Sequence, residues 1–238
     1  MSPSRALLLP CTLLLGAALS AAPLEGVIQP FRQVEVSAPV SSRVEQAKVQ
    51  EGEAVKAGQP LALLYAKLEE LEAERTKALL ERREFEAKGA KRLYDSKVIP
   101  ESKAVECRLD LELARLQYEA AAEQVRLRTV LAPMDGVVVQ RYREVGEAVS
   151  SGQPLFRLVD LSRVVVQCAA DPAAVAPLAV GAKVRVRLPQ LGEQAEADGE
   201  VTLVDPCADA RGKVRVKVVV PNPGGRIRTG LPAQILLP

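Results

Sequence analysis

Histidine and tryptophan are absent from the 238 residues, and aromatic residues make up only 3% of the chain. The absence of histidine removes the commonest general base and the commonest metal ligand. Few aromatic side chains are left to build stacking platforms for nucleic acids or sugars. The 32 basic and 30 acidic residues give a net charge of +2, so no polyanionic partner is indicated. We expect no nucleic-acid partner, no metal site and no cofactor.

Catalytic and nucleotide-binding motifs are also missing. The sequence contains no nucleophile elbow, no Walker loop and no dinucleotide-binding glycine pattern. Carboxylates are plentiful, but they lie in charged segments where a solvated surface explains them better than acid–base chemistry. The sequence therefore predicts a protein that is not an enzyme.

The N-terminus is typical of an export signal. Arg5 precedes an apolar run at residues 6–19, and Ser20, Ala21 and Ala22 supply small residues for cleavage. The run is short for a membrane span, which needs about 20 residues. We interpret residues 1–22 as a signal peptide, the alternative being an uncleaved anchor, and we expect the mature chain to be exported to the periplasm.

Three cysteines remain after the predicted signal: Cys107, Cys168 and Cys207. An odd number leaves at least one thiol unpaired. Cys168 and Cys207 could form a disulfide, although three separate, packed thiols are the favoured interpretation. Their spacing matches no zinc-binding pattern.

The clearest feature is an internal repeat. Residues 36–64 recur at residues 130–158, 94 positions later without a gap, and 14 of the 29 positions are identical. Both copies contain an Ala-Pro pair and, later, two glycines, the second of which opens a Gly-Gln-Pro-Leu sequence. Glycines in this pattern predict tight turns, where a residue without Cβ takes a positive φ. We assign structural turns to Gly52, Gly58, Gly146 and Gly152.

A charged segment, residues 66–128, separates the two copies and is typical of helices. Its first part keeps apolar residues three, four and seven positions apart, which predicts a narrow apolar seam. These residues are Leu64, just before the segment, and Leu68, Leu71, Ala78 and Phe85 within it. A second run with similar spacing contains Val105, Leu109, Leu113, Leu116, Ala120 and Leu127. Pro100, between the runs, cannot continue a helix but can open one. We expect an antiparallel helical hairpin with charged outer faces.

Beyond residue 160 the pattern is that of β-strands. Alternating or apolar runs at 162–168, 183–188, 197–204, 213–220 and 233–237 predict five strands, separated by Pro and Gly. Residues 171–178 are interpreted as one short helix. Residues 24–36 are predicted to form an extended strand that Pro30 interrupts. With this strand closing the sheet near Val27, residues 24–36 and 160–238 predict a small antiparallel β-barrel.

The two repeat copies resemble halves of biotinyl and lipoyl carrier domains. In those domains a lysine lies at the tip of the turn that joins the halves, and Lys67 lies near the matching place. Here a helical hairpin replaces that turn, so the exposed tip that a ligase must recognise is lost. The predicted fold is therefore mainly β with an inserted α-helical hairpin. It comprises a split lipoyl-like (barrel-sandwich hybrid) domain at 37–65 and 129–159, the hairpin at 66–128, and the small antiparallel β-barrel. A carrier function at Lys67 is the weaker alternative.

The whole arrangement resembles the periplasmic adaptor subunits of tripartite efflux pumps, the membrane fusion protein (HlyD) family. The resemblance depends on the export signal, the split at Ala38-Pro39 and Ala132-Pro133, the hairpin, and the C-terminal barrel. It implies a non-catalytic, inner-membrane-associated periplasmic protein that self-associates into a ring, where the polar flanks of neighbouring hairpins line up. It also implies an inner-membrane transporter and an outer-membrane channel as partners. The alternative is a periplasmic scaffold or chaperone with the same fold.

The resemblance places the channel contact at the turn between the helices. The candidate contact residues are Arg92, Leu93, Lys97, Val98, Ile99 and Pro100. Drug-efflux adaptors carry a spaced Arg, Leu and Ser here. Leu93 fits the Leu position, but Gly89 stands where Arg is expected and Pro100 where Ser is expected, so Lys88, Lys91 or Arg92 would supply the charge. Val98 and Ile99 form either a contact patch or a staple between the helices.

Overall fold

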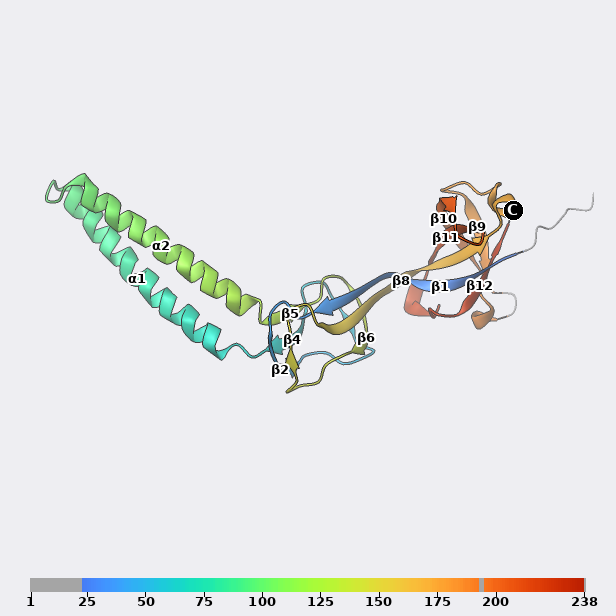
Figure 1. Cartoon of the computed structure of the whole chain (residues 1–238), viewed down its shortest axis with the longest axis horizontal. Coiled ribbons are helices and arrows are strands. Elements are labelled where there is room, and N and C mark those ends of the chain that lie inside the picture. Colours follow the sequence, from blue (N-terminus) through green and yellow to red (C-terminus); the bar gives the residue numbers. More distant parts are fainter. Residues whose placement is uncertain (1–22, 193–194, 238) are drawn as a thin grey trace, which may run out of the picture. The chain divides into compact units, whose positions relative to one another are not determined.

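The computed structural model describes residues 23–192 and 195–237 (Figure 1). The predicted signal peptide, residues 1–22, lies outside the described residues. The fold is mainly β, with 40% strand and 31% helix, as the sequence predicted. The chain divides into two compact units, and both use parts of the long strands β1 (Leu24–Ser37) and β8 (Pro154–Ala170). One unit contains Pro30–Arg163 with Asn222–Arg226, and the other contains the remaining described residues.

The internal repeat is reproduced strand by strand in the first of these units. Each strand of the second copy begins 94 residues after its counterpart, because the same turn residues recur at the same places. The strands of the first copy are β2 (Ser42–Ala47), β3 (Ala54–Val55) and β4 (Pro60–Leu64). Their counterparts are β6 (Gly136–Arg141), β7 (Ala148–Val149) and the start of β8.

Strands pair both within each copy, β2 with β4 and β6 with β8, and between the two copies. β3 pairs with β6, and the equivalent strands β7 and β2 pair in the same way. The Gly58 N–H donates to the Ala132 carbonyl at 2.8 Å, and the Gly152 N–H donates to the Ala38 carbonyl at 2.8 Å. This reciprocal pairing encloses one core, which includes Leu61, Leu64, Val138, Leu155 and Leu158. Neither copy can therefore complete its hydrogen bonds without the other.

The four glycines predicted at turns all have left-handed backbones. Their φ values are 87° for Gly52, 79° for Gly58, 95° for Gly146 and 81° for Gly152. No other atom would lie within 4 Å of a Cβ at these positions. The requirement for glycine here thus comes from backbone conformation and not from crowding.

The inserted hairpin consists of α1 (Lys67–Asp95) and α2 (Glu101–Arg126), which pack along each other in antiparallel directions (Figure 1). The first arm extends past Gly89 to Asp95, because a single glycine weakens a helix without ending it. After α2, strand β5 (Thr129–Leu131) pairs with β4 and returns the chain to the sheet.

The prediction that the large apolar residues form the contact between the helices is wrong. Leu68, Leu71 and Phe85 are exposed, Phe85 to 82%. The residues of the contact between the helices are mainly small, and they repeat at alternating spacings of three and four. The buried or half-buried members are Ala73, Thr76, Leu80, Arg83, Ala87 and Ala90 of α1, and Ala104, Cys107, Leu111, Ala114, Tyr118 and Ala121 of α2. Two stripes of the same period therefore run along each helix, and the bulkier stripe faces outward.

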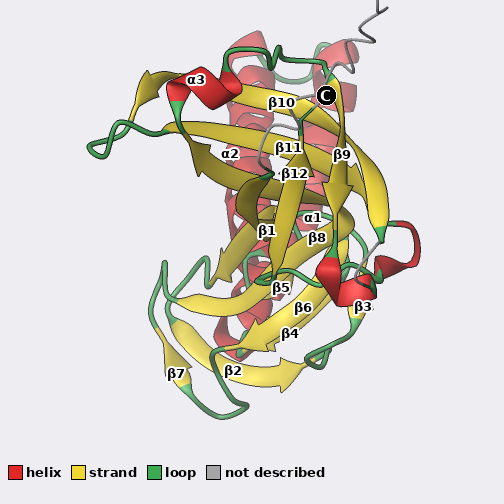
Figure 2. Cartoon of the chain, turned by 90° about the vertical axis from the view of Figure 1, so that its right-hand side faces the viewer, coloured by secondary structure: helices red, strands yellow, loops and turns green. Residues whose placement is uncertain are grey.

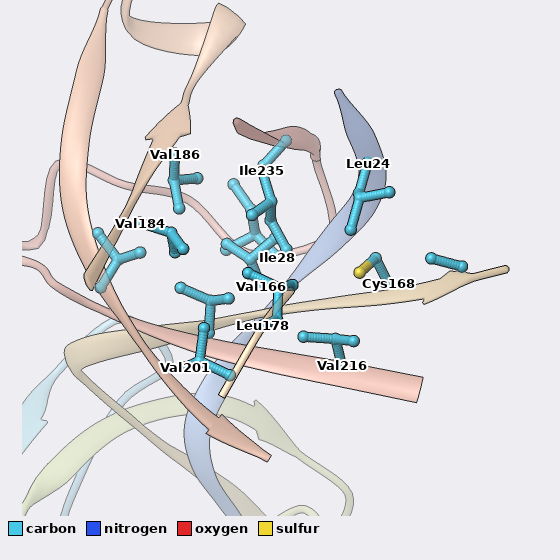
Figure 3. Packing of buried hydrophobic residues seen from close by; sticks show 14 of the residues in the cluster. Leu24, Ile28, Val166, Cys168, Leu178, Val184, Val186, Val201, Val216 and Ile235 are labelled. Atoms are coloured by element: carbon cyan, nitrogen blue, oxygen red, sulfur yellow. The ribbon is translucent and has the colours of Figure 1, made fainter. Parts of the chain in front are cut away.

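The second unit is a β-barrel (Figure 2). Its strands follow the order β1, β12, β9, β10, β11 and β8, and an additional pairing of β1 with β8 closes the barrel. The new members are β9 (Lys183–Arg187), β10 (Glu196–Ala208), β11 (Val214–Pro221) and β12 (Pro232–Leu236). The predicted short helix is α3 (Pro172–Val175), and a 3-10 turn lies at Pro189–Leu191. A second 3-10 turn, Pro223–Gly225, belongs to the first unit. Alternate residues of these strands, including Ile28, Val166, Val186 and Ile235, fill the interior (Figure 3).

Pro30 does not interrupt the first strand, contrary to the expectation from sequence. β1 runs from Leu24 to Ser37 through Pro30. Its ladder with β12 ends at Val27, before the proline is reached. Proline is tolerated in a strand where its missing N–H is not required by a neighbour.

Candidate functional site

The turn between α1 and α2 has the geometry of a Schellman motif. The Lys97 N–H donates to the Tyr94 carbonyl at 2.8 Å, and the Val98 N–H donates to the Leu93 carbonyl at 2.8 Å. Lys97 has a φ of 59° and is the one non-glycine residue with positive φ among residues 23–192 and 195–237. Glycine usually occupies this position in the motif. The two hydrogen bonds end α1 and reverse the chain within a few residues.

The second helix starts immediately after this turn. Pro100 has φ −70° and ψ 156°, an extended conformation, and α2 begins at Glu101 as the sequence predicted. The Lys103 N–H donates to the Pro100 carbonyl at 3.1 Å. Glu101 places negative charge at the positive end of the helix dipole. Proline and glutamate together fix where α2 begins.

The turn brings the six candidate contact residues to one end of the hairpin. We call Arg92, Leu93, Lys97, Val98, Ile99 and Pro100 the tip surface. All are exposed except Ile99, which is half-buried. Val98 is 67% exposed, although an aliphatic side chain of this size gains by burial. The tip surface combines two cations with apolar groups and contains no carboxylate, and its role in partner contact remains a prediction.

A cavity of about 460 Å³ lies beside the tip surface, between the last turns of α1 and the first turns of α2. Its apolar part is formed where Ala87 and Ala104 leave room between the helices, and Lys91, Arg108 and Glu101 provide charge at its walls. Sequence reasoning missed this cavity. The small residues that repeat every three or four positions, such as Ala87 and Ala104, could have indicated where the helices meet and where space is left between them.

The hairpin is fixed to its sheet by an ion pair that sequence reasoning also missed. The Arg128 guanidinium donates to the Glu69 carboxylate and to the carbonyls of Ser41 and Tyr65, at 3.4 and 3.3 Å. The Arg128 side chain is only 15% exposed. Arg128, two residues after the end of α2, thus binds the first turn of α1 and the segments that precede β2 and follow β4.

Lys67, the residue considered for carrier chemistry, is the first residue of α1 and is exposed. The segment between β4 and β5 contains both helices. A carrier lysine would instead require a short exposed β-turn at this place. The local structure therefore gives no support for the carrier alternative.

The three described cysteines are free thiols. Cys168 and Cys207 both line a cavity of about 620 Å³ at the barrel. Cys168 is buried in the barrel core, where burial raises the pKa of its thiol, whereas Cys207 is exposed and Cys107 is half-buried. The suggested Cys168–Cys207 bridge is thus not formed, and Cys207 is not a packed residue.

The described part of the chain, residues 23–192 and 195–237, contains no group of three or more His, Cys, Asp or Glu side chains that could hold a metal ion. Within the same ranges, no helix is long and apolar enough to cross a membrane.

Comparison with protein families agrees with this architecture. A family model described as "RND MFP, barrel-sandwich hybrid domain" matches residues 32–161, more than half of the chain. The chain belongs to the membrane fusion protein family. A second model, described as a CusB-like beta-barrel domain, matches residues 164–238. No curated protein matches the sequence. Membership of this family supports an adaptor role in efflux.

Solved structures with low sequence identity share the fold of this membrane fusion protein. A MacA–MexA chimera containing the Pseudomonas aeruginosa MexA α-hairpin is 20% identical, with a TM-score of 0.81, over 90% of this chain and 79% of the chimera. Membrane fusion protein Spr0693 from Streptococcus pneumoniae is 15% identical, with a TM-score of 0.72, over 90% and 97%. A putative efflux transporter from Bacteroides eggerthii is 19% identical, with a TM-score of 0.71, over 90% and 67%.

Proposed function

We propose that this membrane fusion protein is a non-catalytic periplasmic adaptor that links an inner-membrane transporter to an outer-membrane channel for the efflux of small molecules. The observation that carries the proposal is the tip surface, an exposed apolar and basic turn at the end of a helical hairpin in a chain of this family. The tip surface contacts the channel, and the barrel domain, residues 24–36 and 160–238, docks on the transporter. Copies of the chain form a ring around the path of the substrate.

The backbone and side chains of the turn suit it to a protein contact. The turn is held by backbone hydrogen bonds, so its exposed side chains are free to make intermolecular contacts. Apolar groups surrounded by polar ones are the usual composition of a protein contact surface. The transporter supplies the energy for transport, and the adaptor holds the transporter and the channel in position.

Photocrosslinking in intact cells of the source organism tests the proposal. A photoreactive residue replaces Lys97 in the tip surface, and a control variant carries it at Glu81, an exposed position on α1. We expect crosslinks to an outer-membrane channel from position 97 and none from position 81. Crosslinks from position 97 only to a soluble exported protein would refute the channel contact and favour the scaffold or chaperone function.

A second variant tests the role of Val98. Val98→Asp places a charge in the predicted contact, so we expect weaker crosslinking to the channel and reduced efflux with an unchanged melting temperature. Val145→Asp, at another exposed valine on the β part of the unit, serves as the control. Normal efflux with Val98→Asp would remove Val98 from the contact and favour its role as a staple between the helices.

A further inference from the structure

The cavity beside the tip surface is large enough to hold a small organic molecule. Its volume of about 460 Å³ lies within the range of small-molecule sites, about 300–1,000 Å³. Ala87, Ala104, Val105 and Leu111 form its apolar wall. The two alanine side chains end at Cβ, so they leave space between the helices that longer side chains such as Leu80 fill elsewhere along the contact. An apolar ligand would gain by covering this wall.

Charged residues are separated along the cavity. Asp95 is the last residue of α1 and Glu101 is the first residue of α2, so both carboxylates lie at the end next to the turn. Lys88 and Arg108 are each seven residues farther from the turn, which corresponds to about 10 Å along the helices. Lys91 lies between these levels. The cavity therefore has an acidic end at the turn and a basic end away from it.

The basic end contains cations that are free to bind an anion. Among the residues that the structure describes, Lys91 and Arg108 make no ion pair. Lys88 has one exposed partner, Glu84, at 3.4 Å. A ligand that covers the apolar wall also removes water from the neighbouring cations, and this strengthens their attraction to its own charge. Free cations next to an apolar wall thus form a better anion site than cations on a fully solvated helix face.

Tyr94 gives the cavity a flat wall. Its side chain is 40% exposed and lines the cavity near the acidic end. A tyrosine ring packs against another aromatic group more favourably than the buried area alone would predict. This wall therefore favours a ligand with an aromatic or other flat apolar body.

The larger cavity at the barrel, of about 620 Å³, does not offer the same chemistry. Its two cations are already paired, Arg215 with Asp205 at 2.9 Å and Lys213 with Asp171 at 2.9 Å. Its remaining carboxylate, Asp209, accepts hydrogen bonds from backbone N–H groups of its own turn. A charged ligand in the barrel cavity would have to break these contacts, whereas one in the hairpin cavity would not.

We infer that the hairpin cavity binds an amphipathic organic anion, a carboxylate or sulfonate joined to an aromatic or short aliphatic body. The charged group of the ligand lies beside Lys91 and Arg108, and its body covers the apolar wall and reaches toward Tyr94. The carboxylates of Asp95 and Glu101 oppose the reverse orientation, because they would repel the anionic group. The inference does not rest on the proposed adaptor function, since the ligand lies beside the tip surface whichever partner the tip surface contacts.

Two fluorescent probes with the same aromatic skeleton test the inference. 1-Anilinonaphthalene-8-sulfonate carries a sulfonate, and N-phenyl-1-naphthylamine is the same molecule without it. Each probe is titrated into the purified full chain, and its fluorescence is measured. We expect the anionic probe to saturate one site per chain. The absence of saturable binding of the anionic probe would overturn the inference.

A charge variant shows whether the cations of the cavity hold the anion. Arg108→Gln should weaken binding of the anionic probe about tenfold and leave binding of the neutral probe unchanged. Arg115→Gln is the matched control, since it removes an exposed arginine from the same face of α2, seven residues away and outside the cavity lining. It should change the binding of neither probe. Equal effects of the two variants, or none from Arg108→Gln, would overturn the inference.

A cavity-filling variant shows whether the probe lies between the helices. Ala104→Leu places a larger side chain in the cavity and should weaken binding of both probes. Thermal unfolding followed by far-ultraviolet circular dichroism confirms that the hairpin of this variant is folded. Unchanged binding of the anionic probe to a folded Ala104→Leu variant would exclude the cavity as its site. If this variant does not fold, the comparison of Arg108→Gln with Arg115→Gln decides alone.

Discussion

Replacing Gly58 or Gly152 by valine should destabilise the lipoyl-like part of the chain through the backbone alone. The two residues have φ values of 79° and 81° and are equivalent in the two repeat copies. Apart from the adjacent residues, no atom lies within 4 Å of an added Cβ, so the Cβ itself meets no crowding from the fold. What remains is the strain of an L-residue in the left-handed region, which is larger for a β-branched side chain.

The size of the effect follows from two opposing terms. A left-handed backbone costs an L-residue roughly 1–2 kcal/mol in the folded state. Replacing glycine also makes the unfolded chain less flexible, which lowers the entropy lost on folding and offsets about 0.4–1 kcal/mol of this cost. Valine adds to the strain, so we expect each variant to lose about 1–2 kcal/mol of unfolding free energy. For a unit of this size the melting temperature should fall by about 4–8 °C.

Tyrosine fluorescence can follow this unit alone. The chain has four tyrosines and no tryptophan, and all four tyrosines lie in the unit Pro30–Arg163. Gly89→Ala is the matched control, since Gly89 is also free of neighbours but lies in α1, and there alanine should raise stability by about 0.5–1 kcal/mol. Unchanged unfolding midpoints in both valine variants would refute the argument from positive φ.

Three further predictions concern single side chains. Arg128→Met leaves Glu69 without its partner in a partly buried contact and should cost about 2 kcal/mol in urea unfolding; a loss under about 0.5 kcal/mol would contradict a clamping role. Lys97→Gly removes a left-handed lysine and should raise stability by about 1 kcal/mol in the same assay, and a loss would argue against the Schellman geometry. Cys168, whose burial raises the pKa of its thiol, should react with iodoacetamide at least about 100-fold more slowly than exposed Cys207, and equal rates would exclude its burial. Because the folded thiol keeps its proton above the ordinary pKa of 9.0, stability from this group is intact below that pH and should fall as the pH rises past it.

The lipoyl-like half-domains were predictable because their turns have specific backbone requirements. Each positive-φ glycine fixes a turn, and the same glycines recur 94 residues apart, so β2 and β6 begin at equivalent residues, Ser42 and Gly136. The two copies differ at this position for a reason that sequence could not show. A Cβ at Gly136 would lie 2.5 Å from the Val159 carbonyl oxygen. That neighbour belongs to β8, which pairs with β6.

The turn that carries the tip surface was predicted from its local residues, whereas the cavity beside it and the contacts of Arg128 were not predicted. Pro100 and Glu101 are local signals for a helix start. Arg128 gives no local signal, because its partners Glu69 and Ser41 are distant in sequence and are brought together only by the fold. Polar contacts between residues distant in the sequence depend on how helices and strands are placed against each other, and a single sequence does not contain that information.

The hairpin shows why period alone could not identify its inner seam. Inward Thr76 and Ala90 and outward Leu71 and Phe85 belong to stripes with the same alternation of three and four residues. Choosing the bulkier stripe assumes that the largest apolar residues pack within the chain. That assumption fails in this hairpin, because Phe85 is exposed and Ala90 is buried. Side-chain size does not separate the two stripes either, since half-buried Tyr118 belongs to the inner one. The stripe that faces the partner helix is determined by how the two helices are placed in space, and neither the period nor the size of single side chains contains that information.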